Sequence, residues 1–295
     1  NSIIRNVNNM SNVIIKNDFL TVEIETMGAQ IKSVKNNSNL NLLWSGDEYI
    51  WKDRAPVLFP ICGKLKDDKY IINSKEYTLS AHGYACSKEF EIESSDNTSV
   101  TFLHKSDEKT KEHFPFSYEF RVIYSLTGSK LHIRYNTKNL SNETMYFSVG
   151  AHEGYYCPEG IENYTIIFEK KETLKSFIVN NSLLENNTID ILTDSNILPL
   201  KYDYFKYDSL VFKYISSNSL SLINNSNHKK ITINFNGFDF LVLWSLPDAK
   251  FICIEPWCGI PDSVASNYDI TAKEGIIKLS ANKTHEVIHT IVFEQ

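Results

Sequence analysis

Cysteine is scarce in this sequence, and the few residues present show no pairing pattern. The 295-residue chain has five cysteines, an odd number, and no CxxC spacing occurs. They are Cys62, Cys86, Cys157, Cys253 and Cys258. Secreted domains that depend on disulfide bonds carry dense cysteines in even numbers, whereas cytosolic proteins keep their thiols reduced. The sequence therefore predicts a chain without a disulfide framework, in a reducing, cytoplasmic location.

Long hydrophobic runs are also missing. No apolar stretch approaches the ~18 residues that a transmembrane helix requires. The first residues, NSIIRNVNNM, lack the apolar segment and cleavage site of a secretion signal. We expect residues 1–9 to be a leader or a cloning remnant. The net charge of −6 disfavours binding to nucleic acid or to an anionic membrane surface, so neither is expected as a partner.

The sequence lacks the short motifs of several large enzyme classes. Neither GxGxxG nor GxxxxGK[ST] is present, which argues against a doubly wound nucleotide-binding fold. HxH and closely paired cysteines, two usual spacings of zinc ligands, are missing too. No GxSxG elbow supports a nucleophilic serine. We therefore expect no metal and no cofactor.

Hydrophobic alternation with a period of two is the strongest pattern that the sequence does contain. In FLTVEIE, for example, Leu20, Val22 and Ile24 fall on one face of an extended chain. The runs of this kind are short, rich in Val, Ile, Phe and Tyr, and separated by turn-forming residues. They cover 19–25, 118–126, 131–135, 210–214, 231–235, 240–244, 251–255 and 287–293.

This pattern predicts an all-β fold, a large antiparallel β-sandwich or barrel. No long linker interrupts it, so residues 10–295 are expected to form a single domain. Only a few short helices are predicted, for example around 200–208. The Asn-rich segments 179–188 and 224–228 are expected to be surface loops.

A carboxylate stands out in FICIEPWCGIPDS, residues 251–263. Glu255 precedes Pro256, and a residue before proline favours extended geometry. The apolar neighbours Ile254 and Trp257 would keep the site partly dry, which raises the pKa of a carboxyl group toward that of a useful general base. From these residues alone, Glu255 is a general base, a metal ligand beside Cys253 and Cys258, or an ordinary acid at the end of a strand.

A histidine lies in the second stretch, GAHEGYYCPEG, residues 150–160. The imidazole of His152 can give or take a proton near neutral pH, and the surrounding Gly and Pro residues restrict its backbone. Tyr155 and Tyr156 offer flat faces of the kind on which sugars pack. Glu153 is expected to be solvated. The alternative for His152 is a hydrogen-bonding residue in a turn.

Two further stretches carry polar side chains between small residues. SAHGYAC, residues 80–86, repeats the small–His–Gly–aromatic pattern around His82. RAPVLFPICGKLKD, residues 54–67, offers Arg54 and Lys64 as donors to an anion or a hydroxyl group. The alternative for Lys64 is a solvated hairpin tip.

Taken together, these stretches resemble the aldose 1-epimerases, the galactose-mutarotase-like proteins. The likeness is closest to the branch found in bacterial sugar operons. Members of that branch read roughly RxPVLFP-I-G-R-L-K-D, then HGFAR, then GGHPAFNCP, then a Glu near a final strand. The matching stretches here are RAPVLFPICGKLKD, HGYAC, GAHEGYYCP and CIEPWCGIPDS, in the same order.

The resemblance implies the family's large β-sandwich with a sugar cleft, and it implies roles for particular residues. Glu255 matches the catalytic base, His152 the catalytic acid and His82 a second site histidine. Lys64 stands where the family usually has an arginine beside the sugar. Asp208, in YDSLVFK, matches an aspartate that binds sugar hydroxyls.

The sequence departs from the family pattern at three of these positions. Lys64 keeps the positive charge but loses the two-pronged geometry of arginine. Cys86 replaces the arginine of HGFAR, and Glu153 replaces the proline of GGHPAF. Because Glu255 and His152 are retained, we expect retained chemistry with a shifted sugar preference.

The resemblance implies that the chain interconverts the α and β anomers of an aldose. Glu255 would remove the proton of the C1 hydroxyl while His152 protonates the ring oxygen, which opens the ring. Two alternatives remain: a non-catalytic sugar-binding or regulatory protein on the same scaffold, and a hexose-6-phosphate 1-epimerase with Arg54, Lys64 and Lys66 at its mouth. The expected partner is an aldose, and the expected state is a monomer or a homodimer.

Overall fold

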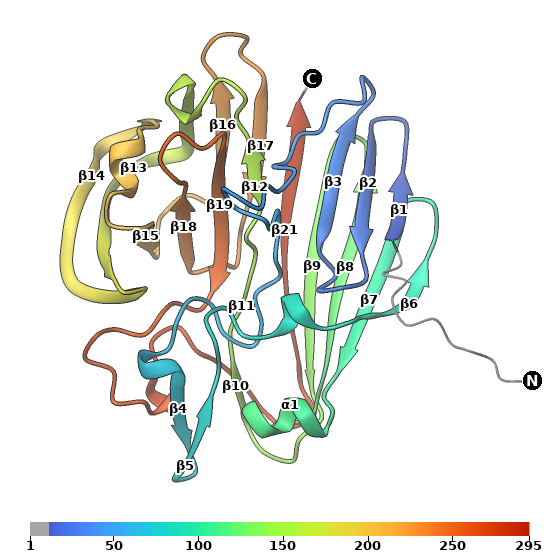
Figure 1. Ribbon diagram of the computed structural model, residues 1–295, viewed down its shortest axis with the longest axis vertical. Coiled ribbons are helices and arrows are strands. Elements are labelled where there is room, and N and C mark those ends of the chain that lie inside the picture. The colour runs from blue at the N-terminus through green and yellow to red at the C-terminus, as the bar shows by residue number, and fades with distance from the viewer. Residues whose placement is uncertain (1–11, 295) are drawn as a thin grey trace, which may run out of the picture.

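Strands dominate the computed structural model, which describes residues 12–294 (Figure 1). The largest assembly is an antiparallel sheet of 14 strands. Along this sheet the order is β11, β19, β18, β15, β13, β16, β17, β21, β9, β8, β7 and β6, with β12 paired to β19 and β14 paired to β13. The prediction for residues 1–9 lies outside the described residues.

The strands of the main sheet all follow residue 90 of the chain. Their bounds are β6 Glu91–Ser95, β7 Ser99–Lys105, β8 Tyr118–Thr127, β9 Lys130–Asn139, β11 Val149–Gly150, β12 Gly154–Tyr156, β13 Tyr164–Asn180, β14 Leu183–Pro199, β15 Leu210–Lys213, β16 Ser219–Asn224, β17 Lys230–Asn234, β18 Phe240–Trp244, β19 Phe251–Cys258 and β21 Thr284–Glu294. Each of the eight runs that alternation predicted coincides with one of the strands in the structure.

The first strands of the chain form a separate antiparallel sheet that lies beside β7, β8 and β9 in Figure 1. It consists of β1 Asn12–Lys16, β2 Leu20–Glu25 and β3 Ile31–Asn36. Leu20, Val22 and Ile24 are buried and belong to the same hydrophobic core as Val122 and Tyr124 of β8. Because two sheets share this core, the predicted all-β antiparallel sandwich is confirmed.

The remaining elements are short. Two-stranded sheets pair β10 Met145–Phe147 with β20 Ile277–Leu279, and β4 Lys69–Ile72 with β5 Lys75–Thr78. The α-helix α1 spans Glu108–His113, and the 3-10 turns are η1 Lys66–Asp68, η2 Ala85–Ser87, η3 Ile161–Asn163, η4 Tyr202–Phe205 and η5 Ile270–Ala272. The turn η4 falls in the region 200–208 where a short helix was expected. Across residues 12–294, none of the helices has the length and apolar character needed to cross a bilayer.

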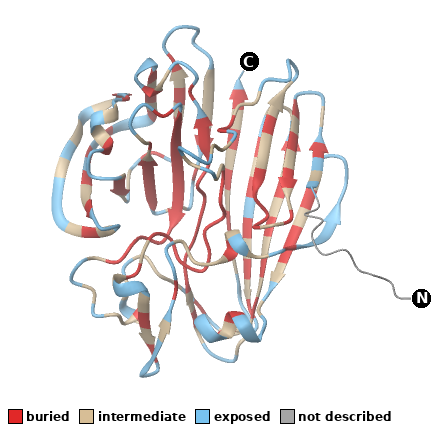
Figure 2. Cartoon of the chain, viewed as in Figure 1, coloured by how far each residue is buried: buried red, intermediate tan, exposed pale blue. Residues whose placement is uncertain are grey.

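The strands β18 and β19 are buried along nearly their whole length, as Figure 2 shows for β19. Their side chains alternate between two apolar environments, because successive residues of a strand point to opposite faces. Leu241 and Ile254 pack into the main core, whereas Val242 and Trp257 belong to a second cluster on the other face. This second face carries the site described below.

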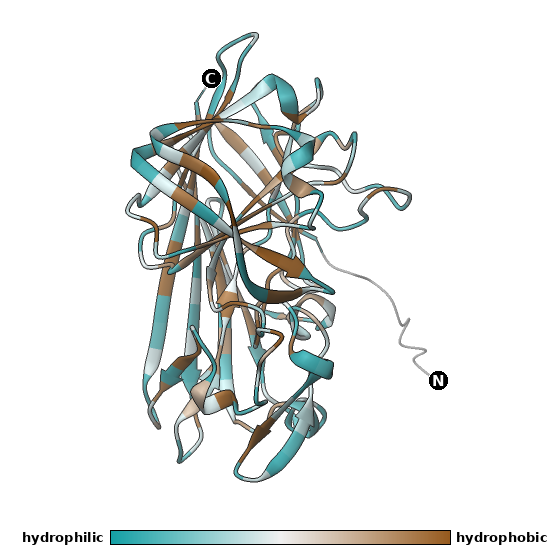
Figure 3. Ribbon diagram, turned by 90° about the vertical axis from the view of Figure 1, so that its left-hand side faces the viewer, coloured by the Kyte–Doolittle hydropathy of each residue, from teal (hydrophilic) through white to brown (hydrophobic). Residues whose placement is uncertain are grey.

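The segment 179–188 is not the surface loop that its Asn-rich composition predicted. It contains the tip of a long hairpin, in which the strands β13 and β14 are joined by Asn181 and Ser182. Both residues have positive φ angles, 50° and 63°, as a tight two-residue hairpin turn requires. Polar and apolar side chains are mixed along this hairpin, which faces the viewer in Figure 3. The sequence prediction was wrong here because polar composition does not distinguish a loop from a solvated strand.

Candidate active site

The pairing of β11 and β12 with β19 brings His152 and Glu255 together. Gly150 lies opposite Trp257 in β11, and Gly154 lies opposite Cys253 in β12. The two pairs share one antiparallel register, and in this register His152 lies directly opposite Glu255. Backbone hydrogen bonds hold this register, because Ala151 N–H donates to the Pro256 carbonyl at 3.1 Å and Ile254 N–H donates to the Glu153 carbonyl at 3.3 Å.

Glu255 lies within β19, not at the strand end where the sequence placed it. The strand continues through Pro256 to Cys258, so the carboxylate is held by paired backbone on both sides. Proline is tolerated at this position because its carbonyl, rather than its missing N–H group, makes the hydrogen bond to Ala151. The carboxylate is therefore rigidly placed on the second face of the sheet.

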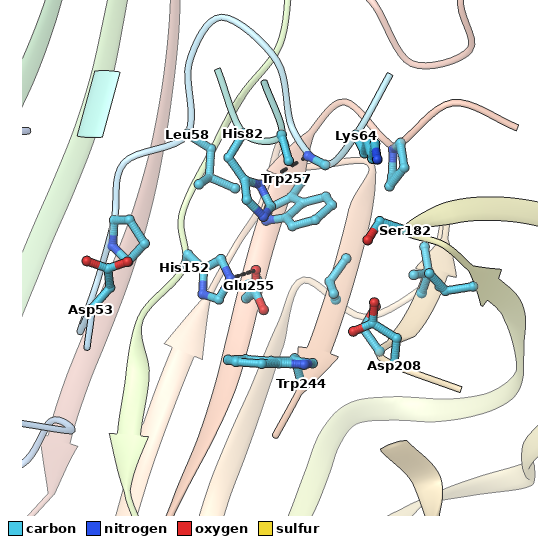
Figure 4. A pocket seen from close by; sticks show the side chains of 18 of the residues that line it. Asp53, Leu58, Lys64, His82, His152, Ser182, Asp208, Trp244, Glu255 and Trp257 are labelled. Carbon is cyan, nitrogen blue, oxygen red and sulfur yellow. Dashed lines mark hydrogen bonds and ion pairs between the residues drawn. The ribbon is translucent and has the colours of Figure 1, made fainter. Parts of the chain in front are cut away.

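A cavity of about 390 Å³ opens above this face (Figure 4). Five of the predicted site residues line it, namely Lys64, His82, His152, Asp208 and Glu255. In Figure 4, His152 and Glu255 lie between Trp257 above and Trp244 below, and Asp208 lies toward the far end of the cavity. Residues from five distant segments of the chain therefore converge on one pocket.

His152 and Glu255 are in direct contact and almost fully buried. Nε2 of His152 lies 3.4 Å from Oε2 of Glu255, and Glu255 is 1% exposed. Burial raises the pKa of the Glu255 carboxyl well above its ordinary value, and the nearby Glu153 and Asp208 act in the same direction. Burial also lowers the pKa of the His152 imidazole well below its ordinary value. The two proton affinities are thereby moved toward each other, which suits a pair that passes one proton to and fro.

His82 is fixed in a single tautomer by a reciprocal contact with Gly63. The backbone N–H of Gly63 donates to the ring Nδ1 of His82 at 3.1 Å. The backbone N–H of His82 in turn donates to the Gly63 carbonyl at 2.8 Å. Because Nδ1 accepts a hydrogen bond, the ring proton is on Nε2. Burial lowers the pKa of His82 to about 4, so the imidazole is neutral at pH 7. His82 thus offers a neutral N–H donor, and its ring lies 5.4 Å from that of His152.

Lys64 and Asp208 lie farther out and provide polar groups at the margin of the cavity. Nζ of Lys64 is 3.9 Å from a carboxylate oxygen of Asp68, so its charge is partly compensated. Asp208 is exposed and has a positive φ of 79°, a conformation that aspartate tolerates better than most residues. Partial desolvation raises the pKa of the Asp208 carboxyl. Both side chains can exchange hydrogen bonds with hydroxyl groups of a ligand.

Arg54 is a predicted site residue that the structure does not place among the residues lining the cavity. Its Nε donates to the Ser45 carbonyl at 2.7 Å, and its Nη1 lies 4.0 Å from Glu25. The guanidinium group therefore fastens the segment around Ser45 to the first sheet. The sequence showed a charged residue at the head of a motif but could not show which way its side chain points.

Tyr155 was expected to present a flat face to a sugar, and this expectation is wrong. The residue is 0% exposed and belongs to the main hydrophobic core. In β12 the next side chain, Tyr156, points the opposite way and is 39% exposed, but it lines a different cavity. Alternation along the strand assigns the two tyrosines to opposite faces, and the sequence did not reveal which face was which.

The aromatic walls of the cavity are formed by three tryptophans, Trp51, Trp244 and Trp257. The Trp51 and His152 rings lie 5.2 Å apart, and Trp244 meets the His152 ring edge to face at 5.8 Å. Trp257 donates its indole N–H to the Ala151 carbonyl at 3.0 Å. Neither Trp51 nor Trp244 was predicted from the sequence as a site residue. Their spacing gives no signal, although Trp244 falls at the end of a predicted strand.

Glu153 was expected to be solvated, but it is 2% exposed. Because neighbouring residues of an extended chain alternate, turning His152 toward the cavity turns Glu153 into the core. Its Oε1 there lies 3.3 Å from Nε2 of His289, which is 0% exposed and belongs to β21. This contact ties the segment that carries His152 to β21 of the same main sheet.

The fold also groups residues that spacing did not connect. His152, Cys253 and Glu255 each offer one possible metal-ligating atom, and these atoms lie within 4.8 Å of one another. The spacing of residues in the sequence gives no sign of this group, because its members come from two segments that only the sheet brings together.

An antiparallel β-sandwich with a buried imidazole–carboxylate pair in a tryptophan-walled cavity is the arrangement of a small-molecule-binding protein equipped for proton transfer. A family model described as aldose 1-epimerase matches residues 11–286. The chain therefore belongs to the aldose 1-epimerase family, as its motifs indicated.

Similar proteins are known from several lactic acid bacteria. The chain is 32% identical over 279 residues to the plasmid-encoded protein LacX of Lactococcus lactis subsp. lactis. The matched region covers 90% of this chain and 93% of the relative. It is similar to the structure of a galactose mutarotase related enzyme from Lactobacillus acidophilus, with a TM-score of 0.92, 32% identity and coverage of 97% and 98%. A galactose mutarotase-like protein from Lactobacillus casei also has a TM-score of 0.92, with 27% identity and coverage of 96% and 100%.

Proposed function

We propose that the protein interconverts the α and β anomers of an unphosphorylated aldose. The observation that carries this proposal is the contact between His152 and Glu255, 3.4 Å apart in a cavity of sugar size. Membership of the aldose 1-epimerase family supports a sugar isomerase. In this reaction a hemiacetal ring opens and closes, so a catalyst must remove one proton and supply another.

In the proposed mechanism, Glu255 accepts the proton of the C1 hydroxyl while His152 donates a proton to the ring oxygen. The ring C–O bond breaks and C1 becomes an aldehyde carbon. Rotation about the C1–C2 bond presents the other face of the carbonyl group. The ring then closes as protonated Glu255 returns a proton to the carbonyl oxygen and neutral His152 takes one from the ring hydroxyl. The pair holds one proton before and after ring opening, and only its position changes.

The other residues of the cavity bind and orient the sugar. His82, with its proton on Nε2, donates a hydrogen bond to an oxygen of the substrate and stabilises charge that develops during ring opening. Asp208 and Lys64 contact hydroxyl groups at the outer end. The indole faces of Trp244 and Trp257 exclude water from the pair, which strengthens its electrostatic interactions.

Exchange NMR tests the proposal, with free hexoses and their 6-phosphates compared at equal concentration. We expect faster anomer exchange for at least one free aldose than in protein-free buffer. For the phosphorylated sugar, kcat/KM should be about 10- to 100-fold lower, because like-charge contacts are unfavourable. Of the described charged residues lining the cavity, Asp53, Asp208 and Glu255 are acidic and Lys64 is basic. Sugar binding without faster exchange would identify a non-catalytic binding protein instead.

Of the three basic residues on which the hexose-6-phosphate alternative depended, only Lys64 is among the described residues that line the cavity. Arg54 is bonded to the Ser45 carbonyl, and Lys66 donates to the Ser266 carbonyl at 3.3 Å. Neither residue lines the cavity. If the phosphorylated sugar nevertheless exchanges faster than the free one, the proposal for an unphosphorylated substrate is wrong.

The pH dependence follows from the single proton of the His152–Glu255 pair. At low pH the pair takes a second proton and Glu255 cannot act as a base, whereas at high pH it loses its proton and His152 cannot act as an acid. Because burial lowers the pKa of His152, the acid limb of kcat/KM should lie below the ordinary histidine value of ~6.5. Because burial raises the pKa of Glu255, the alkaline limb should lie well above the ordinary glutamate value of ~4.3.

Both limbs belong to the pair rather than to either residue alone. Polarimetry across the pH range, corrected for the uncatalysed rate, measures the profile. An acid limb above pH ~6.5 would contradict a mechanism in which buried His152 takes the second proton.

A further inference from the structure

Cys253 lies next to the catalytic pair but has no task in the proposed mechanism. It precedes Glu255 by two residues on β19, so the two side chains share the second face of the sheet. Its thiol belongs to a group of three ligating atoms, with His152 and Glu255, that lie within 4.8 Å of one another. All three residues are buried.

One atom of this group, Oε2 of Glu255, has no hydrogen-bond partner among the described residues. Unpartnered polar atoms in a buried position are costly, and they favour any species that can satisfy them. A divalent cation can act as the missing partner, since imidazole nitrogen and carboxylate oxygen both donate lone pairs to it. The group is thus set up to accept a ligand as well as to transfer protons.

The donor set of nitrogen, sulfur and oxygen matches zinc. Three protein ligands with a fourth position open to a small molecule form a common zinc arrangement, with ligand distances of about 2.0–2.3 Å. Ligands at the corners of such a tetrahedron lie roughly 3.3–3.7 Å apart. Nε2 of His152 and Oε2 of Glu255 are already 3.4 Å apart. Closing the group around one ion then requires side-chain rotations that bring the remaining ligand atoms, all within 4.8 Å of one another, to this spacing.

We propose that His152, Cys253 and Glu255 form a Zn²⁺ site, and that zinc is a reversible inhibitor that competes with the sugar. Binding forms one bond each to nitrogen, sulfur and oxygen. It releases two protons to solvent, one from the Cys253 thiol and one from the His152–Glu255 pair. The thiolate and the carboxylate balance the charge of the ion, so the buried complex is neutral overall. The inhibition rests on the proposed function, because zinc occupies the two groups that move protons during anomer exchange.

Spectroscopy with Co²⁺ tests the site without any activity measurement. Chelator-treated protein is titrated with CoCl2, and coordination by Cys253 should produce a thiolate-to-cobalt charge-transfer band in the near ultraviolet. The band should disappear in the Cys253→Ser and Cys253→Ala variants. It should persist in Cys86→Ser, the matched control, because Cys86 is a thiol that lines the cavity but does not belong to the group of three ligating residues. No band in the unsubstituted protein, or a band lost only in Cys86→Ser, overturns the proposal.

Competition is measured by titrating ZnCl2 calorimetrically with and without a saturating aldose. The sugar should weaken the apparent zinc affinity at least tenfold, and Cys253→Ser should abolish measurable zinc binding. Where anomer exchange is observed, zinc should inhibit it in the unsubstituted protein and in Cys86→Ser but not in Cys253→Ser. A cobalt band that depends on Cys253 in a protein without exchange activity would refute the proposed function while leaving the metal site intact. Zinc binding that is unaffected by a bound sugar would refute the competition.

Discussion

Replacement of Glu255 by glutamine should lower kcat/KM for anomer exchange by about 10²- to 10⁴-fold, the usual contribution of a well-placed general base. The substitution keeps the volume of the side chain and the packing of β19, but an amide cannot accept the C1-hydroxyl proton. Because Glu255 is 1% exposed and its Oε2 has no hydrogen-bond partner among residues 12–294, the free energy of unfolding should stay equal or increase. Polarimetry measures the rate, and thermal unfolding measures the stability.

Glu159→Gln is the matched control for this variant. Its carboxylate accepts hydrogen bonds from Tyr164 at 2.8 Å and Asn224 at 3.2 Å, and it lines a different cavity from the one that holds Glu255. The control should retain the exchange rate of the unsubstituted protein even if its stability falls. A near-normal rate for Glu255→Gln would remove the general base from the proposed mechanism.

Replacement of His152 by asparagine should reduce kcat by a similar factor, about 10²- to 10⁴-fold, with a smaller effect on KM. Asparagine can donate a hydrogen bond to the ring oxygen but cannot transfer a proton to it. The shorter side chain also gives up the contact with Trp51, whose ring lies 5.2 Å from that of His152. Sugar binding should therefore be measured alongside exchange, so that lost chemistry is separated from lost affinity.

The control for this variant is His132→Asn. His132 lies on β9, where Nδ1 is 2.9 Å from the Thr290 hydroxyl, and it does not line the cavity. A second test uses the combined variant with Glu255→Gln and His152→Asn. Residues that act as a unit show non-additive losses, so the double variant should be about as slow as either single variant. Losses that multiply would show that the two residues do not share one proton.

Local sequence was a good guide to the strands and a poor guide to the direction of side chains. The alternation in FLTVEIE predicted β2 because a period of two is a property of consecutive residues. Tyr155 and Glu153 were expected to be accessible but are buried, whereas their neighbour His152 lines the cavity. All three residues belong to one extended segment, in which successive side chains point to opposite faces. The pairing of that segment with the sheet decides which face turns toward the core and which toward the cavity.

The same limit explains why Arg54 was expected in the cavity and Trp244 was not. A guanidinium group has a long, flexible stem, so its position in a motif does not decide which partner it reaches. In the structure its partner is the Ser45 carbonyl. Trp244 contributes to the site because β18 pairs with β19 and places it opposite Cys253, and strand pairing is not encoded in the spacing of a single run.

By itself, then, the sequence determined the all-β class, the positions of the eight predicted strands and, through four ordered motifs, the family. The class, the strands and the motifs can all be read from short runs of consecutive residues. Local backbone preference and side-chain alternation act within such runs and do not require contacts between distant segments. Only the tertiary structure decided that His152 lies opposite Glu255, that Glu153 is buried against His289, and that Cys253 joins the pair as a possible metal ligand. The physical reason is the register between β19 and its neighbours, because backbone hydrogen bonds between distant segments determine which side chains meet.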